Sequence, residues 1–228
     1  MKILALDTSL NATAACVLDT ATGEVLAEEA MFMERGHAEA LLPLVERVVA
    51  KAGGFEVLQR VAVTIGPGSF TGIRIGVAAA RAFGLGCGIP VVGVSTLASL
   101  AAPLLKAGDS TPVLAAIDAR HGQLYAQFFD PQGAGLFEPC VCTPRQALEL
   151  SRSRSLKLIG SGAAAIAIEA WTMGLNAEVV ARRAQPEIRF VARLGALAAP
   201  SHAPARPLYL KSANAKPTAP APVAMAAG

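Results

Sequence analysis

The stretch Val61–Gly88, which reads VAVTIGPGSFTGIRIGVAAARAFGLGCG, constrains the fold more than any other part of the chain. Its first residues are apolar and mostly β-branched, which predicts a short buried strand over Val61–Ile65. The GPG sequence at 66–68 predicts a tight turn. We expect a helix from about Ile73 to Leu85, and Ser69 or Thr71 can cap its N-terminus. The unit is therefore a strand, a glycine-rich turn and a helix.

This helix carries small residues along one side, because Gly72, Gly76, Ala80 and Gly84 recur every four residues. Interior glycines cost a helix about 1 kcal/mol each relative to alanine, so a close contact along this glycine stripe is expected to offset the cost. Three interpretations fit: tight packing on the helix's own sheet, a phosphate site at the helix N-terminus, and contact with another protein. Neither G-x-x-x-x-G-K-[ST] nor G-x-G-x-x-G is present, so support for the phosphate site is weak.

Length and composition set broad limits. The chain has 228 residues, which suits one large domain or two small ones. The formal net charge is only +3, so composition alone does not argue for nucleic-acid binding. The sequence shows no cationic leader and no run of about eighteen apolar residues, and we expect a soluble cytoplasmic protein. The four cysteines include no C-x-x-C, so we expect free thiols and no zinc site.

The order of the expected elements repeats. Each half shows three strands, a helix, a strand that ends in G-x-G and a second helix. The aspartate that ends the first strand and the next turn aspartate are 12 positions apart in both halves, at Asp7 and Asp19 (19 − 7) and at Asp118 and Asp130 (130 − 118). The expected strands are 2–6, 12–18, 25–32, 61–65, 90–94, 113–117, 124–129, a stretch near 141, and 156–159. The expected helices are 37–51, 73–85, 95–105, 143–150, one that ends near 171, and 187–198.

Two βββαβα units in series are the plan of the two-lobed actin-like, hexokinase-like ATPase (ASKHA) fold, which is an α/β fold. We therefore expect an N-terminal lobe over 1–108, which carries the glycine stripe. A smaller C-terminal lobe is expected over 109–211. Residues 212–228 are rich in alanine and proline and are expected to form a disordered tail.

Few residues point to catalysis. Asp7, Thr8 and Ser9 follow the first strand, where they form either a degenerate nucleotide site or a simple hairpin turn. The sequence GSG at 160–162 is a poor phosphate loop. No two histidines are four residues apart, so no helix presents a histidine pair to a metal, and His37 is expected to be a polar surface residue. The basic residues Arg152, Arg154 and Lys157 are expected to form a solvated surface.

Several of these segments together resemble the TsaB (YeaZ) family of bacterial proteins. The resemblance rests on ILALDTS at 3–9, HAEALLP at 37–43, IGPGSFTGIRIGVAAARAFG at 65–84, VGVSTLASLA at 92–101, IDARHGQLYAQFF at 117–129 and PLYLK at 207–211. It covers residues 1 to about 130 well and the remainder loosely. The most specific of these motifs is GPGSFTGIR.

The resemblance implies the actin-like fold and a non-catalytic scaffold that acts in forming threonylcarbamoyladenosine at position 37 of tRNAs reading codons that begin with adenine. It implies pairing with a catalytic TsaD-like subunit, and self-association as a homodimer, through the helix after GPGSFTG. The expected interface residues are Gly72, Ile73, Gly76, Val77, Ala80 and Gly84. A TsaE-like ATPase is implied as a further partner, and tRNA is expected to be reached through the complex.

The resemblance also implies that this chain has no cofactor of its own, and that ATP and a divalent metal belong to the partner subunits. TsaD-like proteins hold their metal with an H-x-x-x-H helix, and the equivalent segment here, Ser95–Ser99, has neither histidine. Two alternatives stay open. In the first alternative the chain is an enzyme, either an ASKHA-fold ATPase or a glycoprotease-like hydrolase. In the second it is a plain homodimeric binding protein.

Overall fold

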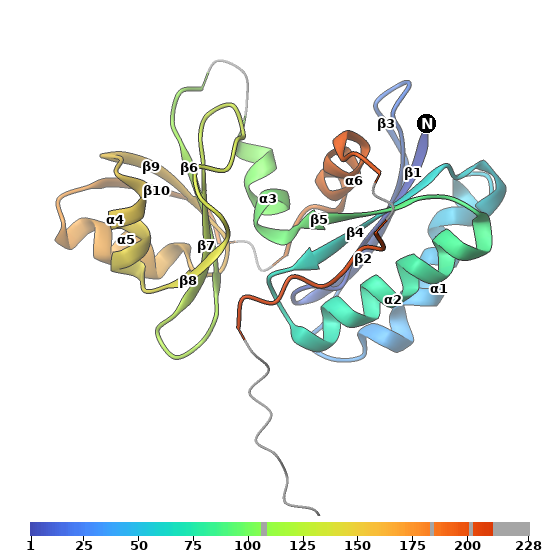
Figure 1. The fold of residues 1–228 in the computed structure, drawn as a ribbon, viewed down its shortest axis with the longest axis horizontal. Helices are drawn as coiled ribbons and strands as arrows, with labels where there is room; N and C mark the ends of the chain where they lie inside the picture. The colour runs from blue at the N-terminus through green and yellow to red at the C-terminus, as the bar shows by residue number, and fades with distance from the viewer. Residues whose placement is uncertain (106–108, 183–184, 201–202, 212–228) are drawn as a thin grey trace, which may run out of the picture.

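The computed structural model describes residues 1–105, 109–182, 185–200 and 203–211. These residues form two five-stranded sheets that lie side by side (Figure 1). The predicted tail at 212–228 lies outside the described residues. Within them no helix is both long and apolar enough to cross a membrane.

The first sheet has the strand order β3-β2-β1-β4-β5. Strands β1 and β2 form an antiparallel hairpin with Asp7 opposite Ala14, and β3 extends it. The strand β4 runs parallel to β1, and β5 runs parallel to β4. The bounds are β1 Lys2–Asp7, β2 Ala12–Asp19, β3 Glu24–Phe32, β4 Arg60–Gly66 and β5 Val91–Ser95.

The second sheet repeats this arrangement in the order β10-β9-β6-β7-β8. The antiparallel partner of β6 is β7, and its parallel partner is β9, as β2 and β4 are for β1. The predicted repeat is therefore confirmed, although β10 was not among the expected strands. The bounds are β6 Val113–Asp118, β7 Leu124–Phe129, β8 Cys140–Cys142, β9 Ser155–Ile159 and β10 Asn176–Ala181.

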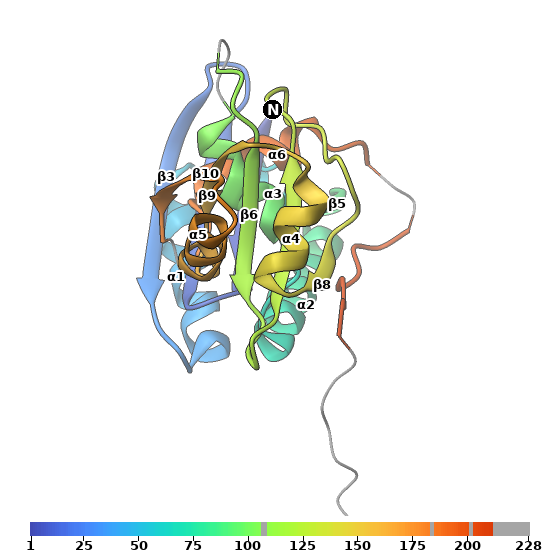
Figure 2. The same cartoon turned by 90° about the vertical axis from the view of Figure 1, so that its left-hand side faces the viewer.

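Helices cover both faces of each sheet. The helices α1 and α2 lie together on one face of the first sheet, and α6 covers the other face. The helices α4 and α5 cover the outer face of the second sheet, toward the viewer in Figure 2, and α3 covers its inner face. The bounds are α1 His37–Lys51, α2 Phe70–Cys87, α3 Thr96–Ala101, α4 Pro144–Ser151, α5 Ala163–Thr172 and α6 Ile188–Leu197, with short 3-10 helices at Phe55–Val57 and Ala102–Leu104.

The last helix of each repeat packs on the sheet of the other. Leu97 and Leu100 of α3 are buried with Val113 and Ile117 of the second sheet. Val191 of α6 is buried in one cluster with residues of the first sheet. The predicted division into 1–108 and 109–211 therefore does not describe where these two helices pack. A helix is stabilised when its apolar side packs on an apolar surface, and for α3 and α6 that surface belongs to the sheet of the other repeat.

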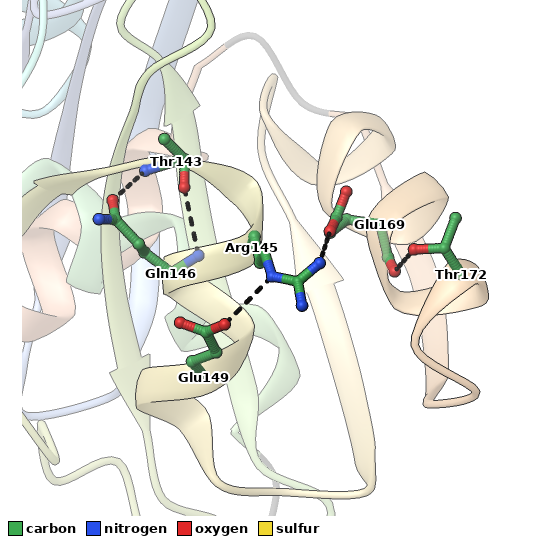
Figure 3. Close-up of polar contacts among 6 residues, drawn as sticks. All are labelled: Thr143, Arg145, Gln146, Glu149, Glu169 and Thr172. Carbon is green, nitrogen blue, oxygen red and sulfur yellow. Dashed lines mark hydrogen bonds and ion pairs between the residues drawn. The ribbon is translucent and has the colours of Figure 1, made fainter.

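Local sequence accounts for the helix ends. Thr143 caps α4 in a capping box, since its hydroxyl accepts from the Gln146 N–H and the Gln146 amide oxygen accepts from the Thr143 N–H (Figure 3). On the same helix Arg145 contacts Glu149, and it reaches Glu169 of α5 at 3.4 Å. The two helices are thereby linked on the outer face of the second sheet. The architecture is the duplicated two-lobed actin-like fold that the element order predicted.

Candidate functional site

The glycine stripe of α2 faces the protein's own interior. Gly72, Gly76, Ala80 and Gly84 are buried, together with Ile73 and Val77. A Cβ atom added at Gly72 would lie 2.0 Å from the Thr8 carbonyl oxygen, and one added at Gly84 would lie 2.2 Å from Val91 Cγ2. The predicted partner interface through these six residues is therefore wrong. The stripe lets the helix approach its own sheet closely, which is the internal-packing interpretation.

The contact joins the glycine-rich turn before α2 to the Asp7-Thr8-Ser9 segment. The β1–β2 turn lies directly against the first turns of α2, where Thr8 Oγ1 donates to the Gly72 carbonyl oxygen at 2.7 Å. The Ser69 N–H donates to the Ser9 carbonyl oxygen, also at 2.7 Å. Ser69 caps the helix by accepting from the Gly72 N–H, as predicted for this position. Without side chains at Gly68 and Gly72, the two backbones can meet.

The opposite side of α2 is exposed and lies beside the exposed side of α1 (Figure 1). Leu85 is 87% exposed on α2, and Leu42 is 58% exposed on α1. We define the α1–α2 outer face as the exposed apolar residues of these two helices, Ala38, Leu42, Pro43, Ala50, Ala78, Ala82 and Leu85. The sequence carries a signal for it, because Leu42 lies off the apolar side formed by Leu41, Leu44, Val45 and Val48.

The C-terminal segment 205–211 returns across α2. Arg81 donates to the Ala205 carbonyl oxygen, and Arg74 Nε donates to the Tyr209 hydroxyl at 2.8 Å. The Leu208 N–H donates to the Ile65 carbonyl oxygen at 2.7 Å, at the end of β4. Two arginines on the exposed side of α2 thus hold this segment against the helix.

The Asp7 carboxyl is buried in the β1–β2 turn, and of its two oxygens Oδ1 is hydrogen-bonded while Oδ2 has no hydrogen-bond partner among the described residues. Its Oδ1 accepts from the Ser9 N–H at 2.9 Å, the Ser9 hydroxyl at 2.6 Å and the Thr64 hydroxyl at 2.5 Å. Asp7, Thr8 and Ser9 are all buried. Burial raises the pKa of the Asp7 carboxyl above its ordinary value, and the hydrogen bonds from Ser9 and Thr64 and the nearby His37 oppose that shift.

This geometry does not fit a metal ion on Asp7. Mg²⁺ in proteins keeps several of its waters, and a carboxyl that is fully buried leaves them no room. The oxygen Oδ1 already accepts three hydrogen bonds. His37 lies close by and is also buried, with Nε2 at 2.9 Å from the Leu10 carbonyl oxygen, so the expectation of a surface residue was wrong. The observed contacts are those of a turn docked under α2.

Asp7→Asn is expected to flatten the pH dependence of stability. The unfolded carboxyl ionises near its ordinary pKa of 3.8, whereas the folded carboxyl keeps its proton to higher pH. Raising the pH above about 4 therefore stabilises the unfolded state through this group, and asparagine removes that effect. Urea unfolding between pH 4 and 8 measures it. Asp118→Asn, at the equivalent and exposed position of the second repeat, is the control. Equal pH profiles for wild type and Asp7→Asn would contradict the assignment.

The second glycine loop is also structural. A Cβ atom at Gly160 would lie 2.2 Å from the Ala116 carbonyl oxygen, and φ there is 103°, a conformation that favours glycine. The Ser161 hydroxyl accepts from the Asp118 N–H at 3.0 Å. Of the basic residues near β9, Arg152 and Arg154 are exposed and Lys157 pairs with Asp109. Among the described residues no three metal-binding side chains cluster.

Comparison with known proteins finds relatives of this chain. The family model described as "TsaD: tRNA N6-adenosine threonylcarbamoyltransferase" matches residues 24–205. The chain is 37% identical over 126 residues to the tRNA threonylcarbamoyladenosine biosynthesis protein TsaB of Escherichia coli strain K12, covering 55% of this chain and 53% of that protein. It is 30% identical over 179 residues to the protein of the same name from Haemophilus influenzae, covering 72% and 74%. The match thus spans about half of the first relative and about three quarters of the second.

A solved structure is similar over nearly the whole chain. YeaZ from Pseudomonas aeruginosa has a TM-score of 0.72 and 27% sequence identity, and the match covers 92% of this chain and 99% of that one. A match of this extent takes in both repeats. The likeness therefore extends past residue 130, where the motif resemblance is loose.

Proposed function

We propose, since the chain belongs to the TsaB (YeaZ) family, that it is a non-catalytic subunit in the biosynthesis of threonylcarbamoyladenosine in tRNA. The names of the Escherichia coli and Haemophilus influenzae relatives support the pathway. The role is to pair with a TsaD-like catalytic subunit and hold it in a competent state. The modified position is adenosine 37 of tRNAs that read codons beginning with adenine.

The observation that carries this proposal is the α1–α2 outer face. Contiguous exposed apolar patches mark interaction sites on protein surfaces, and a partner that lies along both helices would cover the exposed apolar side chains of each. Leu42 and Leu85 are both largely exposed, and the small Ala78 and Ala82 lie on the same side of α2. Small residues allow a partner's helix to approach closely. The same surface serves for self-association as a homodimer when the TsaD-like subunit is absent.

The hydrogen bonds of the Ser95 and Ser99 hydroxyls support a non-catalytic role. At the segment equivalent to the metal-binding helix of TsaD-like proteins, the Ser95 hydroxyl caps α3 and the Ser99 hydroxyl donates to the Ser95 carbonyl oxygen at 2.9 Å. The Asp7 carboxyl is fully buried, and its Oδ1 accepts hydrogen bonds from Ser9 and from Thr64 of β4. An ATPase or a glycoprotease-like hydrolase needs a metal site or a phosphate loop in these places. We assign the ATP and the divalent metal to the partner subunits, which include a TsaE-like ATPase, in the cytoplasm.

Reconstitution tests the proposed function. The full chain mixed with a TsaD-like subunit is expected to elute as one complex in size exclusion with light scattering. The mixture completed with a TsaE-like ATPase, ATP, tRNA and an activated threonylcarbamoyl donor is expected to form threonylcarbamoyladenosine only when the chain is present. Failure to form a complex, together with hydrolysis of ATP or peptide by the isolated chain, would favour the hydrolase alternative.

The isolated chain is expected to bind no stoichiometric divalent metal and to hydrolyse ATP far more slowly than about 1 s⁻¹, the low end for enzymes. The reason is that the described carboxylates, thiols and imidazoles form no metal-binding cluster and the glycine loops contact their own sheets. Elemental analysis and a phosphate-release assay measure the two quantities. A bound ion at one per chain would overturn the assignment.

A further inference from the structure

A pocket of about 820 Å³ lies on the second lobe, beside α4 and the edge strand β8. One wall is formed by α4 and the residue that follows it, and the other by Leu136 and Phe137 of the connection between β7 and β8. Figure 2 shows α4 on the outer face of this sheet, with β8 beside it. Every lining residue belongs to the second lobe, so the pocket is separate from the α1–α2 outer face and from the turn that holds Asp7.

Most of the pocket lining is apolar. Phe128 is buried, and the Phe137 ring stacks on it with the two ring centroids 6.4 Å apart. Leu136 and Leu150, on opposite walls, are 56% and 49% exposed, so apolar surface stays uncovered at the mouth of the pocket. Small-molecule sites typically have volumes of about 300–1,000 Å³ and a mainly apolar lining, and this pocket has both properties.

Two thiols add to this apolar surface. Cys140 and Cys142 are alternate residues of β8, so their side chains lie on the same face of the strand, toward the core under α4. Burial, together with the neighbouring Cys140, raises the pKa of the Cys142 thiol to about 12. The Cys142 thiol is therefore protonated at neutral pH and behaves as a small apolar group. It adds no negative charge that would repel an anionic ligand.

The polar groups left free in the lining are hydrogen-bond donors. Arg152 is the only cation among the described lining residues, and no described residue forms an ion pair with it. The only carboxylate there, Glu149, already accepts from Arg145 Nε at 3.2 Å (Figure 3). Gln146 uses its amide oxygen in the cap of α4, which leaves its amide nitrogen to donate. A guanidinium and an amide N–H together favour an anionic oxygen ligand.

The backbone position of Arg152 is also unusual. It ends α4 with φ of 50°, in the left-handed region. Glycine is the usual residue at such a helix end, because it has no Cβ to strain there. Arginine at this position places a cation beside the apolar pocket at a cost in backbone energy. Replacing Arg152 by glycine therefore removes the cation and relieves the backbone at once, which separates a binding role from a structural one.

We propose that this pocket binds a small amphipathic carboxylate, a molecule with an apolar body and one carboxylate, such as a medium-chain fatty acid. The apolar body lies between Leu136 and Leu150, against Phe128. Arg152 binds the carboxylate, since a planar guanidinium matches its two oxygens, and the Gln146 amide adds a donor. The complementary charge favours an acid over an amine with the same apolar body. The proposal is independent of the scaffold role, because no residue of the pocket belongs to the α1–α2 outer face.

Calorimetric titration of the full chain with sodium dodecanoate, below the concentration at which it forms micelles, tests the site. We expect saturable binding of one molecule per chain, with Kd of about 1–100 μM. Octanoate, which has a shorter chain, is expected to bind at least about tenfold more weakly, because each buried methylene contributes about fourfold in affinity. Dodecyltrimethylammonium, with the same alkyl chain but a cationic head group, is expected to bind at least about tenfold more weakly than dodecanoate.

Arg152→Gly is expected to weaken dodecanoate binding at least about tenfold while keeping a melting temperature at or above that of wild type. Arg154→Gly makes the same substitution at an exposed residue outside the lining, and it is expected to leave binding unchanged. Leu150→Lys places a second cation in the apolar wall and is expected to weaken binding through lost apolar contact.

The proposal holds if dodecanoate binds wild type and Arg154→Gly but binds Arg152→Gly at least about tenfold more weakly. It is overturned if wild type does not bind dodecanoate, if octanoate or dodecyltrimethylammonium binds as tightly, or if Arg152→Gly matches Arg154→Gly. Sedimentation of the ligand-free chain tests a different occupant. A dimer that dissociates in Leu150→Lys, in a chain that does not bind dodecanoate, would assign the pocket to a second copy and overturn the proposal.

Discussion

Gly72→Ala is expected to destabilise the protein by about 1–3 kcal/mol, even though alanine is the better helix former. The added Cβ would lie 2.0 Å from the Thr8 carbonyl oxygen, which is backbone and cannot rotate away. Either the helix or the β1–β2 turn must move, and the hydrogen bond from Thr8 to the Gly72 carbonyl oxygen is strained. For a chain of this size the melting temperature is expected to fall by roughly 2–10 °C. Gly76→Leu, which adds a larger side chain to the same buried stripe, is expected to cost more.

The same helix supplies the matched control. Gly86 lies in α2 near its C-terminal end, and a Cβ atom there meets nothing within 4 Å. Gly86→Ala is therefore expected to stabilise the protein by about 0.5–1 kcal/mol through helix propensity alone. Thermal melting and urea unfolding of the two variants measure the difference. A melting temperature for Gly72→Ala at or above that of wild type would show that the stripe does not contact the β1–β2 turn.

Leu85→Lys is expected to weaken association with the TsaD-like subunit, and self-association, by at least about thirtyfold. Leu85 is the most exposed large apolar side chain of the α1–α2 outer face, and truncating or charging such an anchor typically costs about 2 kcal/mol or more of binding free energy. The fold is expected to keep its stability, because lysine suits an exposed position near a helix C-terminus. Analytical ultracentrifugation for the homodimer and titration with the partner give the two affinities.

Leu197→Lys is the control for this prediction. Leu197 is 84% exposed and ends α6, so the substitution, exposure and helix position all match. It lies on the helix that covers the opposite face of the first sheet, and it is expected to leave both affinities unchanged. Leu42→Lys on α1 is expected to act like Leu85→Lys. Unchanged affinity for both outer-face variants would sink the interface assignment and direct attention to other exposed apolar residues, such as Trp171 on α5.

Much of the fold follows from local sequence. Periodicity and caps predicted α1 at its observed bounds, Ser69 as one of two candidate caps of α2, and the helix after Thr143. The repeated element order predicted the fold class. These features depend on residues close together in the chain, whose propensities and hydrogen bonds act locally. The strand β10 was missed because it is a short edge strand whose burial alternates between partial and exposed, which gives a weak apolar signal.

The site was harder to predict from sequence. Spacing alone shows that Gly72, Gly76, Ala80 and Gly84 share a side of α2, but it does not show what lies against that side. The neighbours that decide it lie outside the helix, Thr8 in the β1–β2 turn and Val91 in β5. A partner helix and the protein's own backbone both favour small residues, so the same pattern fits either. The resemblance pointed to α2, but the residues that it named on this helix are buried inside the protein.

The sequence by itself determined every strand and helix except β10 and the short 3-10 helices, their order, and the family to which the chain belongs. Tertiary structure alone decided which side of α2 faces solvent, that α3 and α6 each pack on the other repeat's sheet, and that Phe128, Leu136 and Arg152 line one pocket. The physical reason is the distance along the chain over which each kind of interaction acts. Propensity, capping and periodicity act over a few residues, whereas burial and close contact join positions that are distant in the chain and are fixed only when the sheets have formed.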